Sequence, residues 1–492
     1  MVGSKITKPR FGVKTIVLAV PKSMPILRVN IIIDSYYIRL IEKFKKKRYA
    51  NKMSFRFRRF LFYSFFIIFI PLSAGIILYS QGWRFNFKTF SAQKTGGIYI
   101  ETEPRDITIK IDGKYFSDRS GIIQNGTLIT DLLPKTYQLT IQKNDYSPYY
   151  KNLEVKPSMV SELINTVLIP EKIEEIEIMP QRLKGDEITE WDAARQKIIV
   201  KNSKSGIYYL YELNNASSVF NINISVNNFS KESVIKKIAF HPFNENKLII
   251  ELESKTKSGL YIFDENKLKL EPLFLNSQNS RIIAWDIKNS NIHLIKKIAA
   301  PKIRLALFSS NLTSKTETEL VEMPIKDKKT AENIKIKISP SGGKIGVLDA
   351  LDDLYIFDIK AQSLKQIAHN AEIFAFSYDD KKIAFVDRDG KLNIYFIEDY
   401  FKNISKKAGD IIDFNLENKK LIKNISWHND SYHLFIEYGG ENGKINFMEI
   451  DDRPPLNIYL IIEKVKDFYY APETEFLYFI KDEKLYKADI NP

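Results

Sequence analysis

The longest apolar run of the chain extends from Phe60 to Ser80 and contains no charged residue. A helix over this run would be about 30 Å long, which matches the hydrocarbon core of a bilayer. The run therefore predicts a transmembrane helix over residues 60–80, in which Pro71 is tolerated. A buried core helix is one alternative, but such helices rarely lack charge over this length. A cleaved signal peptide is the stronger alternative. The run is longer than the apolar region of a signal peptide, about 7–15 residues, and no A-x-A cleavage site follows it.

The charges that flank this run predict its orientation. Arg56, Arg58 and Arg59 stand directly before it, and Lys/Arg in short loops favour the cytoplasmic side. We expect a single-pass signal anchor with a cytoplasmic N-terminus and an extracytoplasmic C-terminal bulk. Tyr79 and Trp83 would lie at the far interface as aromatic anchors.

From Gly96 the pattern changes to an alternation of apolar and polar residues with a period of two, interrupted by turn residues. This pattern predicts a small antiparallel β domain over residues 96–170 with one buried face. Asp112-Gly113 and Asn125-Gly126 are hairpin turn signals.

From Asp186 to the C-terminus, one theme recurs at intervals of roughly 40–50 residues, and such a period is typical of a β-propeller. Each unit has a strand that closes on an aromatic residue, a polar turn, a second apolar strand, and usually a third strand with aromatics. The first strands are Ile188–Trp191, Ile238–Phe240, Ile282–Trp285, Ile373–Phe376, Ile425–Trp427 and Phe468–Tyr470. Ile334–Ile338 fits the theme more loosely, because it ends on isoleucine. The pattern predicts a seven-unit β-propeller over residues 171–492, and two stacked β-sandwiches are the main alternative.

The last unit supplies only three strands of its own, which would leave an open sheet edge. Glu171–Met179 alternates at period two through Ile176 and Ile178, immediately before the first unit. We expect this segment to pair with the last unit as its fourth strand.

The net charge of +14 is confined to the segment before the predicted helix. Residues 1–59 hold 16 Lys and Arg against Asp34 and Glu42, and the rest of the chain is neutral overall. Attraction to anionic lipid and membrane topology explain such a basic cytoplasmic segment, so nucleic acid is not expected as a partner. The chain has no cysteine, which excludes disulfides and thiol chemistry. Met53 opens a compact basic and then apolar segment, so Met1 and Met53 are alternative starts.

Residues 96–170 resemble the PEGA domain, a small β-sandwich module of bacterial envelope proteins. The resemblance lies in Thr102-Glu103-Pro104, Ile111-Asp112-Gly113-Lys114, Leu133-Pro134 with Tyr137, and Tyr146. The family's tetrapeptide is replaced by Pro104-Arg105-Asp106-Ile107, and glycines expected near Lys135 and Asp145 are missing. The resemblance implies a cell-envelope setting and no particular activity.

The repeated units resemble TolB-type and related WD40-like propellers. The resemblance is carried by the turns Ser339–Lys344 and Ser377–Lys382, and it implies the propeller fold.

The candidate chemical motifs have simpler structural interpretations. Ser341-Gly342-Gly343-Lys344 lacks the frame of a phosphate-binding loop and is interpreted as a turn. Asp387-Arg388-Asp389-Gly390 lacks the distal ligands of a calcium loop and is interpreted as a hairpin. The histidines (His241, His293, His369, His428 and His433) are scattered. Only His428 and His433 lie close together, without an acidic partner at ligand spacing, so no metal site is predicted.

The aromatics that close the first strands are interpreted as packing between units instead of ligand platforms. They are Trp191, Phe240, Trp285, Phe376 and Trp427. No hydrolase elbow, metalloprotease motif or dinucleotide fingerprint occurs in the sequence. No catalytic, cofactor-binding or metal-binding residue is therefore predicted, and no cofactor.

The sequence predicts a mainly β, non-catalytic, membrane-anchored binding or scaffold protein of the bacterial cell envelope. The bilayer would be contacted through residues 60–80. The propeller would recognise an envelope protein or a cell-wall polymer. The alternative is an envelope hydrolase of glycans or peptides with a carboxylate pair at the propeller channel.

Overall fold

The computed structural model describes the helix and the β-rich body of the chain. The described residues are 54–87, 90–120, 125–179, 181–213, 219–227, 233–254, 258–299, 301–324, 333–417, 421–440 and 442–490. The alternative starts Met1 and Met53 lie outside the described residues, as does most of the basic segment 1–59.

The apolar run forms a single helix, α2 (Phe55–Ser80), which includes Pro71. Ser54 caps its N-terminus, because its Oγ accepts the backbone N–H of Phe57 at 3.2 Å. None of its side chains is buried, and its length and composition are sufficient to cross a membrane. A signal sequence would have the same properties.

A short hairpin of β1 (Trp83–Asn86) and β2 (Ser91–Lys94) follows the helix and was not predicted. The ring of Phe85 lies against those of Phe87 and Phe90, with centroids 5.1 and 6.3 Å away, and all three side chains are exposed. The guanidinium of Arg84 lies 3.5 Å from the ring centroid of Tyr79 and pairs with Asp131 at 2.7 Å.

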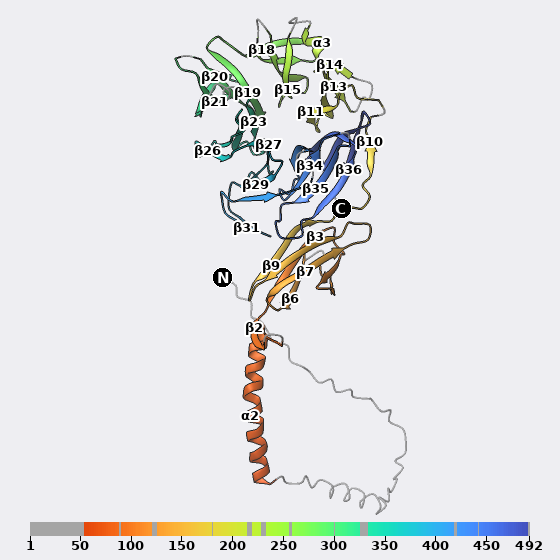
Figure 1. The fold of residues 1–492 in the computed structure, drawn as a ribbon, viewed down its shortest axis with the longest axis vertical. Coiled ribbons are helices and arrows are strands. Elements are labelled where there is room, and N and C mark those ends of the chain that lie inside the picture. The colour runs from red at the N-terminus through yellow and green to blue at the C-terminus, as the bar shows by residue number, and fades with distance from the viewer. Residues whose placement is uncertain are drawn as a thin grey trace, which may run out of the picture. The chain divides into compact units, whose positions relative to one another are not determined.

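Residues 96–167 form two facing sheets (Figure 1). The first has the order β6 (Thr127–Leu132), β3 (Gly96–Glu103), β9 (Val160–Val167). The second has the order β5 (Lys114–Ser117), β4 (Thr108–Ile111), β7 (Lys135–Gln142), β8 (Tyr149–Val155). Alternating apolar residues fill the core between the sheets, including Ile98, Ile109 and Leu139. The expectation of purely antiparallel pairing is wrong at one place, because β3 and β9 are parallel. β9 follows β8 of the opposite sheet, so no hairpin forces it to run antiparallel to a neighbour.

The two predicted hairpin turns have different outcomes. Asp112 and Gly113 have φ angles of 48° and 79°, and they join β4 to β5 as a tight hairpin. Asn125-Gly126 is not a hairpin turn, because β5 and β6 belong to different sheets and β6 pairs with β3. A Cβ at Gly126 would lie 2.4 Å from the carbonyl oxygen of Ile100, so glycine is needed there for the close approach of two strands.

Seven four-stranded sheets follow in the described part of the chain. The first three sheets are β11 (Glu187–Asp192), β12 (Lys197–Lys201), β13 (Tyr208–Glu212), β14 (Val219–Asn221); β15 (Val234–Phe240), β16 (Lys247–Glu253), β17 (Gly259–Asp264), β18 (Lys269–Leu275); and β19 (Ser280–Lys288), β20 (Asn291–Ile298), β21 (Arg304–Asn311), β22 (Glu317–Met323). A short helix, α3 (Ile222–Asn227), follows β14.

The fourth sheet contains β23 (Lys335–Ile338), β24 (Lys344–Leu348), β25 (Leu354–Asp358) and β26 (Ser363–Ala368). The fifth contains β27 (Ala371–Phe376), β28 (Lys382–Asp387), β29 (Leu392–Phe396) and β32 (Ile411–Phe414), with the small hairpin β30 (Tyr400–Phe401) and β31 (Ser405–Lys406) inserted before β32. The sixth contains β33 (Ile422–Trp427), β34 (His433–Tyr438), β35 (Lys444–Glu449) and β36 (Ile458–Glu463). The seventh contains β37 (Val465–Ala471), β38 (Phe476–Lys481), β39 (Lys484–Asp489) and β10 (Glu175–Glu177).

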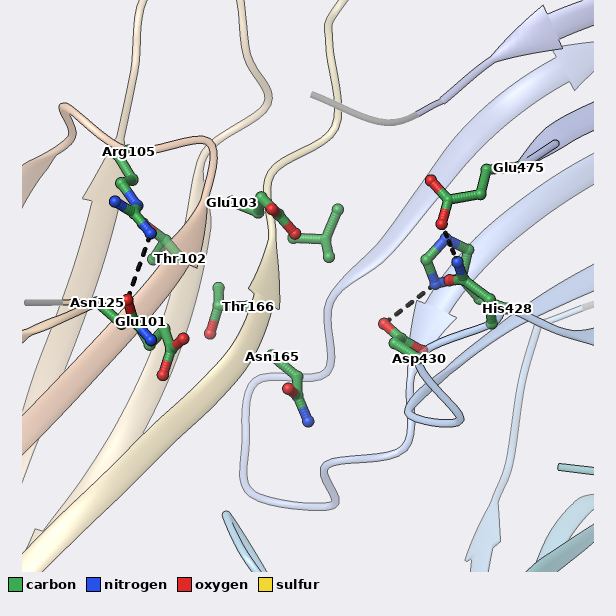
Figure 2. Close-up of a pocket in the computed structure, with 12 residues that line it drawn as sticks. Glu101, Thr102, Glu103, Arg105, Asn125, Asn165, Thr166, His428, Asp430 and Glu475 are labelled. Atoms are coloured by element: carbon green, nitrogen blue, oxygen red, sulfur yellow. Dashed lines mark hydrogen bonds and ion pairs between the residues drawn. The ribbon is translucent and has the colours of Figure 1, made fainter. Parts of the chain in front are cut away.

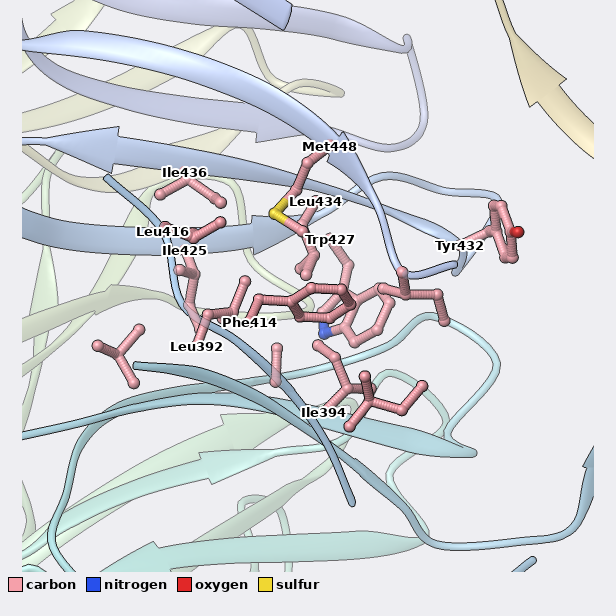
Figure 3. Packing of buried hydrophobic residues seen from close by; sticks show 14 of the residues in the cluster. Leu392, Ile394, Phe414, Leu416, Ile425, Trp427, Tyr432, Leu434, Ile436 and Met448 are labelled. Carbon is pink, nitrogen blue, oxygen red and sulfur yellow. The ribbon is translucent and has the colours of Figure 1, made fainter. Parts of the chain in front are cut away.

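Each sheet shares an apolar core with the next, and the seventh shares one with the first. Figure 3 shows the core between the fifth and sixth sheets, where Trp427 lies against Ile394 and Phe414. The cyclic order of the seven cores is propeller-like and is not the arrangement of two stacked sandwiches. We refer to these sheets as the ring.

The predicted fourth strand of the last sheet is confirmed. β10 pairs antiparallel with β39, with Ile176 opposite Lys487, and the backbone N–H of Ile178 donates to Leu485 O at 2.9 Å. Lys481 pairs with Glu175 at 2.6 Å, and Lys484 pairs with Glu177 at 2.8 Å. The segment therefore closes the last sheet from the opposite end of the ring.

Replacement of Ile178 by proline should destabilise the ring, because it removes the hydrogen bond to Leu485 and disturbs the contact with the core between the seventh and first sheets. We expect a loss of about 2–3 kcal/mol in the free energy of unfolding, measured by urea denaturation. Glu177→Pro is the matched control, because the alternation of the ladder directs the Glu177 N–H away from β39. Equal losses for the two variants would contradict a pairing role for β10.

Candidate functional site: the cavity between the sandwich and the ring

A buried ion pair joins the sandwich to the sixth sheet of the ring. Lys151 lies on the inward-facing side of β8, and its Nζ lies 2.5 Å from Glu449 Oε1, with both side chains almost fully buried. The same ammonium donates to the carbonyls of Arg453 and Pro455 at 2.9 and 3.2 Å. The Tyr149 hydroxyl donates to the other carboxylate oxygen of Glu449 at 2.7 Å. These bonds satisfy both charges, as a buried pair requires.

Further contacts extend this joint on both sides. Asn457 Nδ2 donates to Glu449 Oε1 at 2.7 Å and to the carbonyl of Tyr150 at 2.8 Å. The backbone N–H of Ile164 donates to Asn403 Oδ1 at 2.7 Å, from the hairpin inserted in the fifth sheet. Val167, at the end of β9, packs into the core shared by the sixth and seventh sheets. The sandwich and the ring are therefore joined by polar and apolar contacts together.

A polar cavity of about 450 Å³ lies beside this joint (Figure 2). The sandwich lines one side of it and the turns of the sixth and seventh sheets line the other. The lining residues are Glu101, Thr102, Glu103, Arg105, Asn125, Asn165, Thr166, Val167, His428, Asn429, Asp430 and Glu475. Four carboxyl side chains face one arginine among them, so the cavity favours a cationic occupant.

The turn between β33 and β34 brings two imidazoles to one carboxylate. Asp430 Oδ1 accepts the backbone N–H groups of Tyr432 and His433 at 2.8 and 3.0 Å, which fixes the turn. Its Oδ2 accepts Nδ1–H of His433 at 2.6 Å and lies 3.1 Å from Nδ1 of His428. Burial alone would raise the pKa of Asp430, but the two histidines outweigh it and hold that pKa well below its usual range.

His428 is the least satisfied member of this group. Its side chain is only 6% exposed and packs against the rings of Tyr470, Phe447 and Phe435. Neither of its ring nitrogens makes a well-formed hydrogen bond to a described residue. Nδ1 at least faces Asp430, whereas the buried Nε2 lacks the partner that such a group is expected to have.

The statement that no acidic residue accompanies His428 and His433 at ligand spacing is therefore wrong. Asp430 stands two residues after the first and three before the second, and a tight turn directs its carboxylate between them. The sequence signal was H-x-D-x-x-H, which a search for helical or two-cysteine spacings does not detect. The other three histidines do not join the group: His241 Nδ1 accepts the N–H of Phe243, His369 pairs with Asp353, and His293 is buried in β20.

The remaining sequence motifs form turns or pack in cores between the sheets. Ser341, Gly342 and Gly343 lie in the turn between β23 and β24, and Lys344 begins β24. Asp387 Oδ1 accepts the N–H groups of Asp389 and Lys391, as in a hairpin turn. The aromatics that close the first strands lie in the cores between neighbouring sheets, which confirms their packing role: Trp191, Phe240, Trp285, Phe376 and Trp427.

The comparisons with known proteins show no family for this chain. No protein-family model matches it, so the resemblance to the PEGA domain has no support there, and no curated protein matches it either. Among solved structures it is similar to a chain of "Crystal Structure of Mitotic Checkpoint Complex", with 8% identity and a TM-score of 0.41. That match covers 65% of this chain and 94% of the other, and its TM-score is too low to support an argument. The propeller-like description therefore rests on the sheets and cores of this chain.

Replacement of Lys151 by methionine should destabilise the full chain strongly, because Glu449 would remain buried without its cation. We expect a loss of about 3–5 kcal/mol in the free energy of unfolding, measured by denaturant titration. The double variant Lys151→Met/Glu449→Gln should recover part of this loss, because it removes both charges. A single variant as stable as the wild type would show that the pair does not hold the sandwich on the ring.

Proposed function

We propose that this protein is a non-catalytic, membrane-anchored binding or scaffold protein of the bacterial cell envelope. Its sandwich and ring would act together as one extracytoplasmic recognition body for an envelope protein or a cell-wall polymer. The observation that carries the proposal is the buried joint at Lys151 and Glu449, which couples the two β-structures beside a polar cavity. A recognition body with two coupled parts requires such a connection, whereas flexibly linked modules do not.

Two features support the membrane anchor in this proposal: helix α2, which ends at Ser80, and the hairpin that follows it. α2 is apolar and has no buried side chain. The hairpin that begins three residues later exposes Phe85, Phe87 and Phe90 as one aromatic cluster. Exposed aromatics directly after an apolar helix suit the interface between lipid and water, where aromatic side chains are enriched.

The cavity favours binding over catalysis. Its described lining offers carboxylates, amides, two threonines, one arginine and one buried histidine. The histidine is directed toward a carboxylate and not toward a hydroxyl nucleophile (Figure 2). Acyl transfer would require a nucleophile that is hydrogen-bonded to a base, with a third group orienting the base. The contacts described for these lining residues include no such chain of three groups.

One observation favours the hydrolase alternative. Glu190 on β11, Lys237 on β15 and Asp286 on β19 interact across the first strands of three neighbouring sheets. Burial raises the pKa of Glu190 to about 8, with Lys237 opposing this rise and Asp286 adding to it. Both oxygens of Asp286 accept backbone N–H groups, from Ile287 at 2.9 Å and Ile338 at 3.0 Å, so this carboxylate is held in a structural role. We therefore retain binding as the primary proposal.

The absence of cysteine allows a direct test of topology. Single cysteines introduced by Tyr115→Cys, at an exposed position in the sandwich, and by Ser54→Cys, before the helix, would have no competing thiol. With any outer layer permeabilised, a membrane-impermeant maleimide should label the first variant in intact cells and the second only after lysis. Labelling of the Ser54 variant alone in intact cells would reverse the orientation, and labelling of neither would place the body in the cytoplasm.

Glu190 also generates a prediction of pH dependence. Its pKa is raised from 4.5 to about 8, so between these pH values the folded state holds a proton that the unfolded state has lost. The contribution of this group to the free energy of unfolding is therefore fully present below about pH 4.5 and is lost as the pH rises through 8. Glu190→Gln should leave stability nearly unchanged at pH 5 and raise it at pH 9 by about 1 kcal/mol, because the partly exposed side chain is screened. Urea unfolding at both pH values measures this, with Glu271→Gln on the exposed surface as the control. An equal effect of Glu190→Gln at the two pH values would contradict the raised pKa of this carboxyl group.

A further inference from the structure

We propose that His428, Asp430 and His433 form a binding site for a divalent transition-metal ion, zinc or an ion of similar preference. Two imidazoles and one carboxylate are a donor set that such ions take, whereas calcium and magnesium prefer oxygen alone. The inference does not depend on the proposed binding role, because it concerns only the chemistry of this turn.

The ligand atoms of these residues are already assembled. One donor atom from each of the three side chains lies within 4.8 Å of the others. A tetrahedral ion with bonds of about 2.0–2.1 Å needs donors about 3.3 Å apart. The distances from Asp430 Oδ2 to the Nδ1 atoms of His433 and His428 are 2.6 and 3.1 Å, so a small opening of the turn would admit the ion.

The equivalent turn of the fifth sheet provides an internal comparison. Ser377-Tyr378-Asp379-Asp380-Lys381-Lys382 has the same length as the turn from His428 to His433, and in both turns the first N–H donates to the last carbonyl at 2.9 Å. In the fifth sheet Lys382 Nζ lies 2.6 Å from Asp379 Oδ2, and Ser377 Oγ donates to Asp379 Oδ1 at 2.5 Å. A lysine and a serine therefore satisfy the aspartate in that turn without any ion.

In the sixth sheet histidines replace both of these partners around the aspartate. His433 stands where the fifth sheet has lysine, and His428 stands where it has serine. The ion pair that satisfies the fifth turn is retained in part, through His433, but His428 contributes a buried ring with no well-formed hydrogen bond among the described residues. Asp430 Oδ2 lies 3.1 Å from Nδ1 of this imidazole, and a metal ion between the two would replace that loose contact with a bond.

The turn from His428 to His433 lies at the wall of the cavity, so an ion could reach it and would be attracted by the carboxylates there. His428 and Asp430 line the cavity, and Glu103 and Glu475 lie among the side chains that face them (Figure 2). Carboxyl groups exceed basic groups in this lining, so a bound cation would reduce the repulsion between the carboxylates on the two sides of the cavity. The cavity also leaves room for water or a further ligand beside the ion.

The test is titration of the metal-free full-length chain, in detergent, with Zn²⁺ by calorimetry and with Co²⁺ by visible absorption. We expect one ion per chain and a Co²⁺ spectrum of a low-coordinate site with nitrogen ligands. The decisive variant is His428→Ser/His433→Lys, which gives the sixth turn the chemistry of the fifth and should fold without metal. Its affinity for the ion should fall by about 100-fold or more. Asp430→Asn should also weaken binding, while its side-chain oxygen can still accept the N–H groups that fix the turn.

His369→Gln is the matched control, because it removes another histidine–aspartate pair that has no second histidine. This variant should bind the ion as the wild type does. The proposal is overturned if the wild type binds neither ion stoichiometrically, or if the double variant binds as tightly as the wild type. The wild-type titration decides the question even if a variant fails to fold.

Discussion

The structure depends on the pairing of β10 with β39, because this pairing joins the two ends of the ring. A four-stranded sheet of this kind buries its faces only against neighbouring sheets, so each of the seven needs a partner on both sides. The seventh sheet contributes three consecutive strands, and the fourth comes from a segment before the first sheet. Trp191 then packs against Tyr478 with ring centroids 3.8 Å apart, across the contact of the first and last sheets. Closure by a distant strand converts seven marginal units into one cooperative body.

The same segment explains how the sandwich is held on the ring. The chain leaves β9 through Val167 and Ile169, which lie in the core between the sixth and seventh sheets, and then enters β10. The end of the sandwich is therefore anchored beside the point of closure. Lys151 and Glu449 fix the orientation at a second point, and the cavity with His428 and Asp430 lies where the two structures meet. The position of the candidate site thus follows from closure and docking together.

Periodicity predicted the elements better than it predicted their partners. Strands with one buried face, such as β7, were evident from alternation, and strands buried on both faces, such as β12, were evident from the repeat. The closing strand followed from counting strands in the last unit. The parallel pairing of β3 with β9 was not evident, because alternation carries no information on direction. Asn125-Gly126 resembled a hairpin, although Gly126 is needed for contact with Ile100.

The candidate site was less predictable, because its residues are defined by tertiary contacts. Lys151 occupies an inward position of β8 that a sequence pattern assigns to apolar residues, and only its partner Glu449, 298 positions away, explains it. His428, Asp430 and His433 are close in the sequence, but they are recognisable as a site only from the turn geometry that directs Asp430 between the two imidazole rings. Such sites become recognisable in the sequence only when equivalent turns of a repeat are compared.

Hydrogen–deuterium exchange of the full-length chain, resolved by peptide, tests the central claim of closure most directly. If β10 is an integral strand of the seventh sheet, the amide of Ile178 should be protected to the same order as amides in β38, because both open only when the ring opens. Exchange of the Ile178 amide at the rate of an unstructured linker, with β38 still protected, would contradict the account.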